Sequence, residues 1–348
     1  MRVIASIPQD NLRSFAKGAK AMEEAGYDVL LTLENRNDPF LPLGVAAVGT
    51  ERIGLATGVA VAFARSPMAV ANIGWDLQTA SGGRFVLGLG PQVKGHNERR
   101  FSVKWSAPGP RLREYIGALR AIWRCWEIGE KLDYQGEHYQ FTLMTPNFTP
   151  SSAHLPPVPI TIAAVGPYML NLAGETCDGV RLHPFLTDRY LREESLKSVE
   201  QALAKSGRKR ENFEVTCGMF ICTGPDDAAV QRMLEWARYR ISFYGATRTY
   251  WPVFEKHGLH DLGEKLYRMS VEGKWDQMPN EVPDDVVELF TIHGPHKVLA
   301  RAIEKRLGGI VDAIYANLKN DAAPDFPPGL IQDIQRIPTP FKGYKTAW

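Results

Sequence analysis

The chain has 348 residues, of which 44% are hydrophobic and 23% charged, and its 41 Lys and Arg residues against 39 Asp and Glu residues leave a formal net charge of +2. These proportions are typical of a packed globular protein and exclude a disordered, collagen-like or coiled-coil chain. The charge is too balanced to supply the basic field that nucleic acid or an anionic membrane surface requires, so we expect neither partner.

The first half of the chain alternates short β-branched runs with amphipathic stretches, the pattern of βα units around a parallel sheet. The helix predicted last in this half has its apolar residues on one face, as expected of a helix packed on a sheet. The predicted strands cover residues 3–7, 29–33, 53–61 and 84–90, and the predicted helices cover residues 11–25, 42–49, 67–80 and 112–126.

The second half opens with a hairpin predicted over residues 132–143 and continues the alternation. Between residues 250 and 282 the periodicity weakens, and we expect a long excursion that acts as a lid. Strands are predicted over residues 160–165, 179–182, 213–222 and 309–318, and helices over residues 167–176, 188–206, 225–244, 283–307 and 327–337. Eight strands, each followed by a helix, without a linker, predict one α/β domain over residues 1–348, a single (β/α)8 TIM barrel with an active site at the C-terminal strand ends.

The N-terminal residues lack the apolar core of a signal peptide, and no run reaches the roughly 18 apolar residues of a membrane span. We therefore expect a cytoplasmic protein. The four cysteines stand singly, without the spacing of a zinc site or a disulfide framework. They predict reduced core thiols and no metal.

The ends of strands 2 and 3 carry two unusual compositions. Residues 33–38 form a polar cluster after an apolar run, and a helix cap or loop explains most such clusters. Residues 56–62 place small side chains where a barrel normally has bulky ones, which leaves room for a flat ligand. Small side chains that only make room for the Trp75 ring would give the same composition.

The end of strand 5 predicts an anion site. Gly166 is expected to form a tight turn and Pro167 to take the first helical position, which leaves the amides of Tyr168 and Met169 free at the helix N-terminus. Such donors hold phosphate, although many helices begin with Gly-Pro for structural reasons alone.

Two further strand ends carry titratable side chains. After strand 4, Gly88-Leu89-Gly90 is no dinucleotide fingerprint, because Val93 takes the place of the third glycine. The loop that follows offers His96 and Glu98 as proton carriers, with a solvated, ion-paired loop as the alternative. His183 ends strand 6 and is followed by Pro184, and a purely structural histidine is the alternative there.

Together these segments resemble the bacterial luciferase-like family of flavin- and deazaflavin-dependent oxidoreductases over residues 2–318. The Gly-Pro helix start and the Leu-Ala-Gly-Glu stretch are closer to the branch that uses coenzyme F420 than to the branch that uses FMN. The resemblance rests on the order and spacing of residues 56–59, 65–67, 81–90, 163–167, 172–175, 178–180 and 293–295.

The resemblance implies the positions of the cofactor contacts. A non-prolyl cis peptide at Gly58–Val59 would form a bulge that backs the tricyclic ring. The implied cofactor-binding residues are Glu34, Gly58, Val59, Ala60, Gly90, Ala164, Val165, Gly166, Pro167, Tyr168, Met169 and His183.

The resemblance also implies a departure in the catalytic positions. Asn35 stands where relatives acting on sugar phosphates or alcohols place a catalytic histidine, and an amide cannot accept and release a proton. Val93 replaces a glutamate of those relatives. The catalytic candidates are therefore Asn35 by position, with His96, Glu98 and His183 as proton carriers.

Three functions follow from the resemblance. The first is hydride transfer between coenzyme F420 and a small, apolar or aromatic substrate; the alternatives are an FMN-dependent monooxygenase and a non-catalytic deazaflavin binder. The polyglutamate tail of the cofactor is expected to meet Lys94, Arg99 and Arg100, unless these residues pair with Glu98 or a neighbouring subunit. A homo-oligomer is left open.

Overall fold

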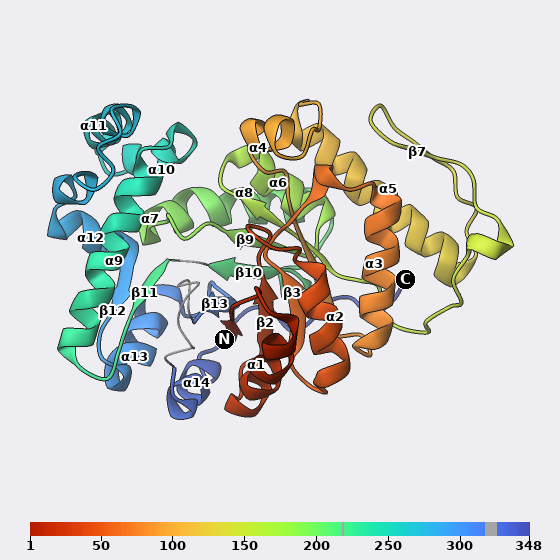
Figure 1. Cartoon of the computed structure of the whole chain (residues 1–348), viewed down its shortest axis with the longest axis horizontal. Coiled ribbons are helices and arrows are strands. Elements are labelled where there is room, and N and C mark those ends of the chain that lie inside the picture. Colours follow the sequence, from red (N-terminus) through yellow and green to blue (C-terminus); the bar gives the residue numbers. More distant parts are fainter. Residues whose placement is uncertain (218, 317–325) are drawn as a thin grey trace.

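The fold is seen in a computed structural model that describes residues 1–217, 219–316 and 326–348 (Figure 1). Its barrel strands are β1 (Arg2–Ala5), β2 (Val29–Thr32), β3 (Gly54–Thr57), β5 (Phe85–Gly90), β8 (Ile160–Ala164), β9 (Gly179–Leu182), β10 (Glu214–Cys217) and β13 (Ala313–Tyr315). Each strand pairs in parallel with the next, β3 pairs with β5, and β13 pairs with β1, so the ring closes. The predicted (β/α)8 barrel is confirmed.

Helices pack around the outside of this barrel. The side chain of Asn11 caps the first helix by accepting the N–H groups of Arg13 and Ser14. The helices that follow the strands are α1 (Leu12–Ala25), α2 (Phe40–Gly49), α3 (Pro67–Ala80), α4 (Lys94–Arg99), α5 (Pro108–Ile128), α6 (Pro167–Thr176), α7 (Asp188–Tyr190) continuing through a π-helix (Leu191–Leu196) into α8 (Lys197–Lys205), α13 (His296–Leu307) and α14 (Pro328–Gln335).

The predicted third strand is interrupted. It consists of β3 and the short β4 (Ala60–Val61), and between them lies the cis peptide Gly58–Val59 that the resemblance implies. The hydroxyl of Thr57 spans the interruption, since it donates to the carbonyl of Gly88 at 2.7 Å and accepts the Gly88 N–H at 2.8 Å. This side chain takes over where the ladder between β3 and β5 stops.

The predicted hairpin is confirmed as β6 (Tyr134–Gln135) and β7 (Gln140–Phe141), which project away from the barrel at the right of Figure 1. The long helix predicted over residues 283–307 is wrong. The chain forms α12 (Asp284–Phe290), then β12 (Thr291–His293), and only then α13. The β-branched pair Thr291 and Ile292 pairs with β11 (Phe220–Cys222), and Gly294 turns with a φ of 146° that stops a continuous helix.

The predicted excursion is helical rather than irregular. Four short elements occupy it: a 3-10 turn (Arg248–Tyr250), α10 (Trp251–Glu255), α11 (His260–Val271) and a second 3-10 turn (Met278–Glu281). With α9 (Asp227–Gly245) and α12 they gather on one side of the barrel, at the left of Figure 1, and we call residues 227–290 the helical cap. The elements between residues 248 and 281 are too short to give a long periodic pattern in the sequence.

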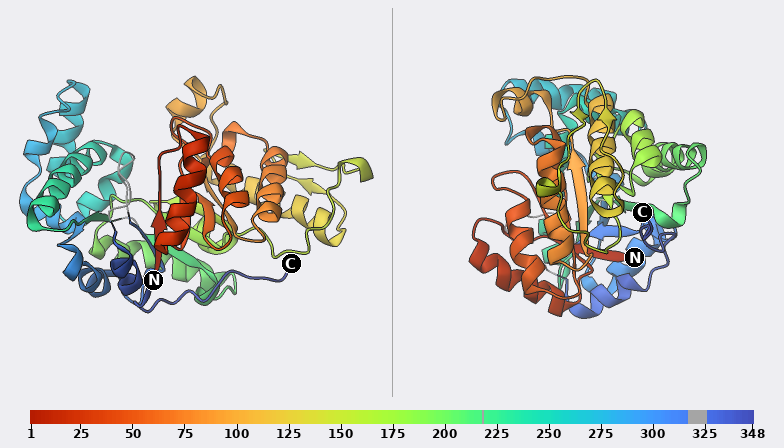
Figure 2. Two further views of the ribbon diagram at one scale, coloured as in Figure 1. Left: turned by 60° about the horizontal axis from the view of Figure 1, so that its bottom comes forward. Right: turned by 90° about the vertical axis from the view of Figure 1, so that its right-hand side faces the viewer.

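The N-terminal ends of the barrel strands, called the floor here, are closed by the C-terminal segment, which runs along the lower edge of the left view in Figure 2. Tyr344 of that segment donates to Glu214 at 2.6 Å, and Arg2 donates to the same carboxylate at 2.5 Å. Residues 218, 317 and 318 of the predicted seventh and eighth strands lie outside the described residues. Within the described ranges, none of the helices combines the length and apolarity needed to cross a bilayer.

Candidate active site at the barrel mouth

The C-terminal strand ends, called the mouth here, contain a wall made by glycines. A Cβ on Gly88 would lie 1.9 Å from the carbonyl oxygen of Thr57, and one on Gly90 would lie 2.6 Å from Cγ2 of Val59. A Cβ on Gly58 would lie 2.5 Å from the side chain of Leu31. The backbone contact requires glycine at position 88, so β3 and β5 approach closely there, and the other two glycines keep the bulge free of large side chains.

Glu34 holds this bulge in place. Its side chain is 5% exposed and accepts the N–H of Val61 at 2.6 Å, while Arg65 donates to both carboxylate oxygens at 2.9 Å. Arg65 also pairs with Asp38 at 2.7 Å. Because both oxygens of Glu34 are engaged by the protein, the residue positions the bulge, and a direct contact with cofactor stays a prediction.

The start of α6 has three backbone amides available to a ligand. Gly166, Tyr168 and Met169 find no backbone acceptor among the described residues, and the first N–H of the segment that bonds within the turn is that of Leu170. Pro167 takes the first helical position as predicted. The predicted tight turn at Gly166 is wrong, because its φ of −86° and ψ of 163° are extended and open to any residue. No atom lies within 4 Å of a Cβ placed there, so the space beside Gly166 is open.

His183 is enclosed by rings of the helical cap. Its ring stacks on Tyr250 at 4.5 Å between centroids and meets Tyr244 edge-on at 4.4 Å. Its Nδ1 accepts the N–H of Phe185 at 3.1 Å, so the proton of the neutral ring lies on Nε2. Burial among these rings, with the nearby Arg240 cation as a smaller cause, lowers the pKa of His183 to about 3.

These facts argue against the predicted role of His183 as a proton carrier. A ring with this pKa is neutral at pH 7, so it can donate a hydrogen bond from Nε2 but does not exchange a proton with a reacting group. The histidine at the end of β9 therefore offers a hydrogen-bond donor of fixed direction. Its position at the mouth is as predicted.

The other catalytic candidates are exposed. Asn35 turns its side-chain oxygen back onto the N–H of Arg36 at 2.6 Å, and its carbonyl accepts from Arg100. His96 and Glu98 lie on α4, where Glu98 is 4.0 Å from Lys94. The ion pair of the alternative interpretation is thus present, but the predicted loop is wrong, because these residues form a helix. The structure does not bring these side chains together with His183.

Four functional positions were missed from the sequence: Thr57, Arg65, Tyr244 and Arg240. The first two support the bulge, and although they lie in segments 56–59 and 65–67 that carry the resemblance, neither was given a role there. Tyr244 and Arg240 lie one helical turn apart on α9, and this i, i+4 spacing was the only available signal. Tyr250, which was noted only as the start of the excursion, joins them at the mouth.

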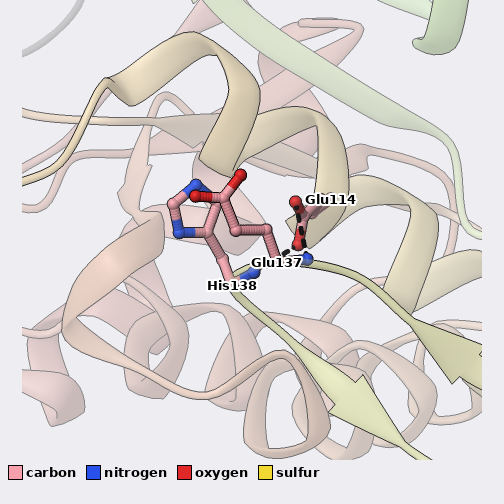
Figure 3. A group of neighbouring side chains, drawn as sticks. All are labelled: Glu114, Glu137 and His138. Carbon is pink, nitrogen blue, oxygen red and sulfur yellow. Dashed lines mark hydrogen bonds between the residues drawn. The ribbon is translucent and has the colours of Figure 1, made fainter.

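One group of side chains has the composition of a metal site, and the geometry explains it otherwise. Glu114, Glu137 and His138 have ligand atoms within 4.8 Å of one another (Figure 3). The carboxylate of Glu114, however, accepts the N–H groups of Glu137 at 3.1 Å, His138 at 2.7 Å and Tyr139 at 3.3 Å. It therefore closes the hairpin turn onto α5, and we assign no metal to it.

Comparison with known proteins gives a consistent result. The profile described as Luciferase-like monooxygenase matches residues 2–312. An uncharacterized protein of Mycobacterium tuberculosis is 45% identical over 314 residues, which cover 90% of this chain and 92% of that protein. The 5,10-methylenetetrahydromethanopterin reductase of Archaeoglobus fulgidus is 28% identical over 305 residues, which cover 85% of this chain and 86% of the reductase.

Two solved structures share the fold. The coenzyme F420 dependent tetrahydromethanopterin reductase from Methanopyrus kandleri has a TM-score of 0.77 at 20% identity, over 97% of both chains. A type II Baeyer-Villiger monooxygenase of Pseudomonas putida in complex with FMN has a TM-score of 0.67 at 16% identity, over 99% of this chain and 100% of the other. At these identities the likeness concerns the fold alone.

Proposed function

Because the chain belongs to the luciferase-like monooxygenase family, we propose that it is an oxidoreductase that uses coenzyme F420 and transfers a hydride between this deazaflavin and a small organic substrate at the barrel mouth. The observation that carries the proposal is the pairing of two features at one mouth. One is the wall without large side chains at Gly58, Gly88 and Gly90, and the other is the set of free amides at the start of α6. A relative from Mycobacterium tuberculosis that is named a putative coenzyme F420-dependent oxidoreductase, 28% identical over 302 residues, favours this cofactor.

The residues at the mouth fit a flat ring joined to a phosphate. Gly58, Val59, Ala60 and Gly90 form a wall of small side chains for the ring, with Ala164 and Val165 at the end of the neighbouring β8. The amides of Gly166, Tyr168 and Met169 supply phosphate donors at the positive end of a ten-residue helix. When bound, the deazaflavin supplies a hydride donor or acceptor at C5.

The protein's own contribution is orientation and exclusion of water. The neutral His183 offers an Nε2–H donor of fixed direction, and Tyr244 and Tyr250 pack against its ring. Two ion pairs hold the helical cap, which carries these tyrosines, against the π-helix that follows β9. Lys256 of the cap pairs with Glu193 at 2.9 Å and with Glu194 at 2.6 Å. A cap held in this way shields the mouth from solvent.

An FMN-dependent monooxygenase is the second candidate function. The family name favours it, and a wall of small residues suits a flavin as well as a deazaflavin. A deazaflavin binder without catalysis uses the same contacts. Cofactor choice and turnover separate the three functions.

The test is a pair of measurements on the purified protein. Fluorescence titration compares the affinities for F420 and FMN, and anaerobic reoxidation of bound reduced F420 is followed with a panel of enones, imines, nitroaromatics and ketones. We expect tight F420 binding and reoxidation by at least one acceptor class. Retained FMN with NAD(P)H-driven oxygen uptake would show a monooxygenase, and F420 binding with no reoxidation would show a binder.

A further inference from the structure

We propose that Arg240 binds a carboxylate of the substrate, so that the enzyme acts on an acid with a flat apolar body seated against His183, Tyr244 and Tyr250. The proposal rests on the function above, because it takes the mouth as the place where the substrate binds. It adds the chemical class of that substrate and one residue that selects it.

Arg240 is connected to the mouth through Tyr244. Its guanidinium donates to the hydroxyl of Tyr244 and lies 4.8 Å from the centre of that ring. Tyr244 in turn meets His183 edge-on, with 4.4 Å between ring centroids. The positive charge of Arg240 is near enough to His183 to disfavour a second positive charge on that ring. The Arg240 cation therefore lies at the mouth beside the C-terminal end of β9.

The guanidinium has no acidic partner among the described residues. Its Nε is buried and has no hydrogen-bond partner, and the structure assigns no acceptor to Nη1. The neighbouring Arg238, by contrast, pairs with Glu235 at 3.2 Å and with Asp284 at 2.5 Å. Glu281, on the turn packed against α9, pairs with Lys265. The acids around α9 are thus engaged elsewhere, and a buried donor left without an acceptor calls for a ligand.

The surroundings of Arg240 select a carboxylate on a flat body. A guanidinium offers adjacent N–H donors whose fork matches the two oxygens of a carboxylate. The rings of His183, Tyr244 and Tyr250 lie 4.4 to 5.7 Å apart and present apolar faces next to the cation. Among the described residues, Arg240 is the one cation that lies against these rings, and this suits a monoanion.

The test measures binding rather than turnover. Acids and their matched amides, namely cinnamate with cinnamamide, 3-phenylpropionate with its amide and 2-naphthoate with its amide, are titrated calorimetrically into the protein with and without F420. We expect at least one acid to bind about tenfold or more tightly than its amide, as a lost charge-assisted hydrogen bond implies. In Arg240→Gln the two should bind about equally, and Arg240→Lys should keep part of the preference.

Arg248→Gln is the matched control, since Arg248 also lies on rings of the helical cap, those of Trp251 and Tyr267, without contact to Tyr244. It should keep the full acid preference. The proposal is overturned if none of the acids binds, if acid and amide bind alike to the wild type, or if Arg240→Gln keeps the preference.

F420 titration of the same samples separates this proposal from the proposed function. Arg240→Gln should bind F420 as the wild type does. If it loses affinity for F420 but not for an analogue without the polyglutamate tail, the carboxylate belongs to the cofactor and the proposal is wrong. If the wild type does not bind F420, the proposed function fails, while an acid preference of the cofactor-free protein would still uphold the role of Arg240.

Discussion

The floor and the mouth of the barrel use polar side chains in opposite ways. At the floor, Glu214 is paired on both sides, by Arg2 and by Tyr344, and Asp312 is paired with Arg210 at 2.8 Å. At the mouth, Nε of Arg240 and the first amides of α6 have no acceptor among the described residues. Polar groups that satisfy one another hold a fold together, whereas open polar groups at a mouth are available to a ligand.

Protonation equilibria follow the same division. Burial alone would raise the pKa of the Glu214 carboxyl, but the cations of Arg2 and Arg181 outweigh it, and the pKa is lowered below its ordinary value. At the mouth, burial and a like charge both lower the pKa of His183. The floor is therefore built from compensated charges, while the histidine of the mouth is kept neutral.

The largest effect is expected at the floor, from Glu214→Gln. The glutamate is 2% exposed, and the loss of its charge leaves Arg2 and Arg181 without their buried counter-ion. We expect the free energy of unfolding to fall by about 3–5 kcal/mol, measured by urea denaturation. Tyr344→Phe, which removes one hydrogen bond and no charge, should cost less. A change under about 1 kcal/mol for Glu214→Gln would show that the floor network does not stabilise the fold.

The next effect concerns the wall of the mouth. In Gly88→Ala the new Cβ would meet the backbone oxygen of Thr57, which cannot rotate away. We expect a loss of about 1–3 kcal/mol in unfolding free energy, measured in the same way. Gly44→Ala in α2 is the control, since no atom lies within 4 Å of its added Cβ. Equal stability of the two variants would contradict the close approach of β3 and β5.

Gly166→Val should separate binding from stability. The extended backbone at Gly166 accepts valine, so the free energy of unfolding should change by about 1 kcal/mol or less. The side chain would, however, occupy the space in front of the α6 amides, and we expect F420 affinity to fall by more than about tenfold, which is about 1.4 kcal/mol. Unchanged F420 affinity in a fluorescence titration would show that the phosphate does not bind at this helix.

A smaller, salt-dependent effect is expected for the tail of the cofactor. Arg99→Glu combined with Arg100→Glu should weaken F420 binding at low salt and hardly affect an analogue without the tail, because exposed charges are screened over roughly 8–10 Å. Arg100 already donates to the carbonyl of Asn35, and Lys94 lies 4.0 Å from Glu98, so these charges are in part committed. Equal losses of affinity for both ligands would indicate that Arg99 and Arg100 lie against the ring or the phosphate.

The smallest effect concerns His183, whose protonation state is expected not to change between pH 5 and 8. Its pKa of about 3 in the folded protein lies below the ordinary value of 6.5. The stability that its neutral form contributes is therefore fully present above pH 6.5 and is lost as the pH falls toward 3. An NMR titration, with His183→Asn for assignment, should show a constant ring shift from pH 5 to 8. A midpoint in that range would restore the residue as a proton carrier.

Sequence patterns predicted the barrel better than the mouth. Alternation of strands and helices is local, so the eight barrel strands and most helices were found. The break at β12 was missed, because Thr291 and Ile292 become a strand only by pairing with β11. At the mouth, the resemblance located the bulge, but Arg240 and Tyr244 meet His183 only through the fold. Contacts between elements far apart in sequence leave no periodic signal.

The central claim is that the mouth, and not the floor, is built to hold a cofactor, and that the cofactor is F420. A crystal structure of the protein soaked with F420 tests it most directly. We predict density for the ring against the bulge at Gly58–Val59 and density for the phosphate on the amides of Gly166, Tyr168 and Met169. Density in the open groove of about 630 Å³ beside the hairpin, or FMN in the mouth of the protein as purified, would contradict the account.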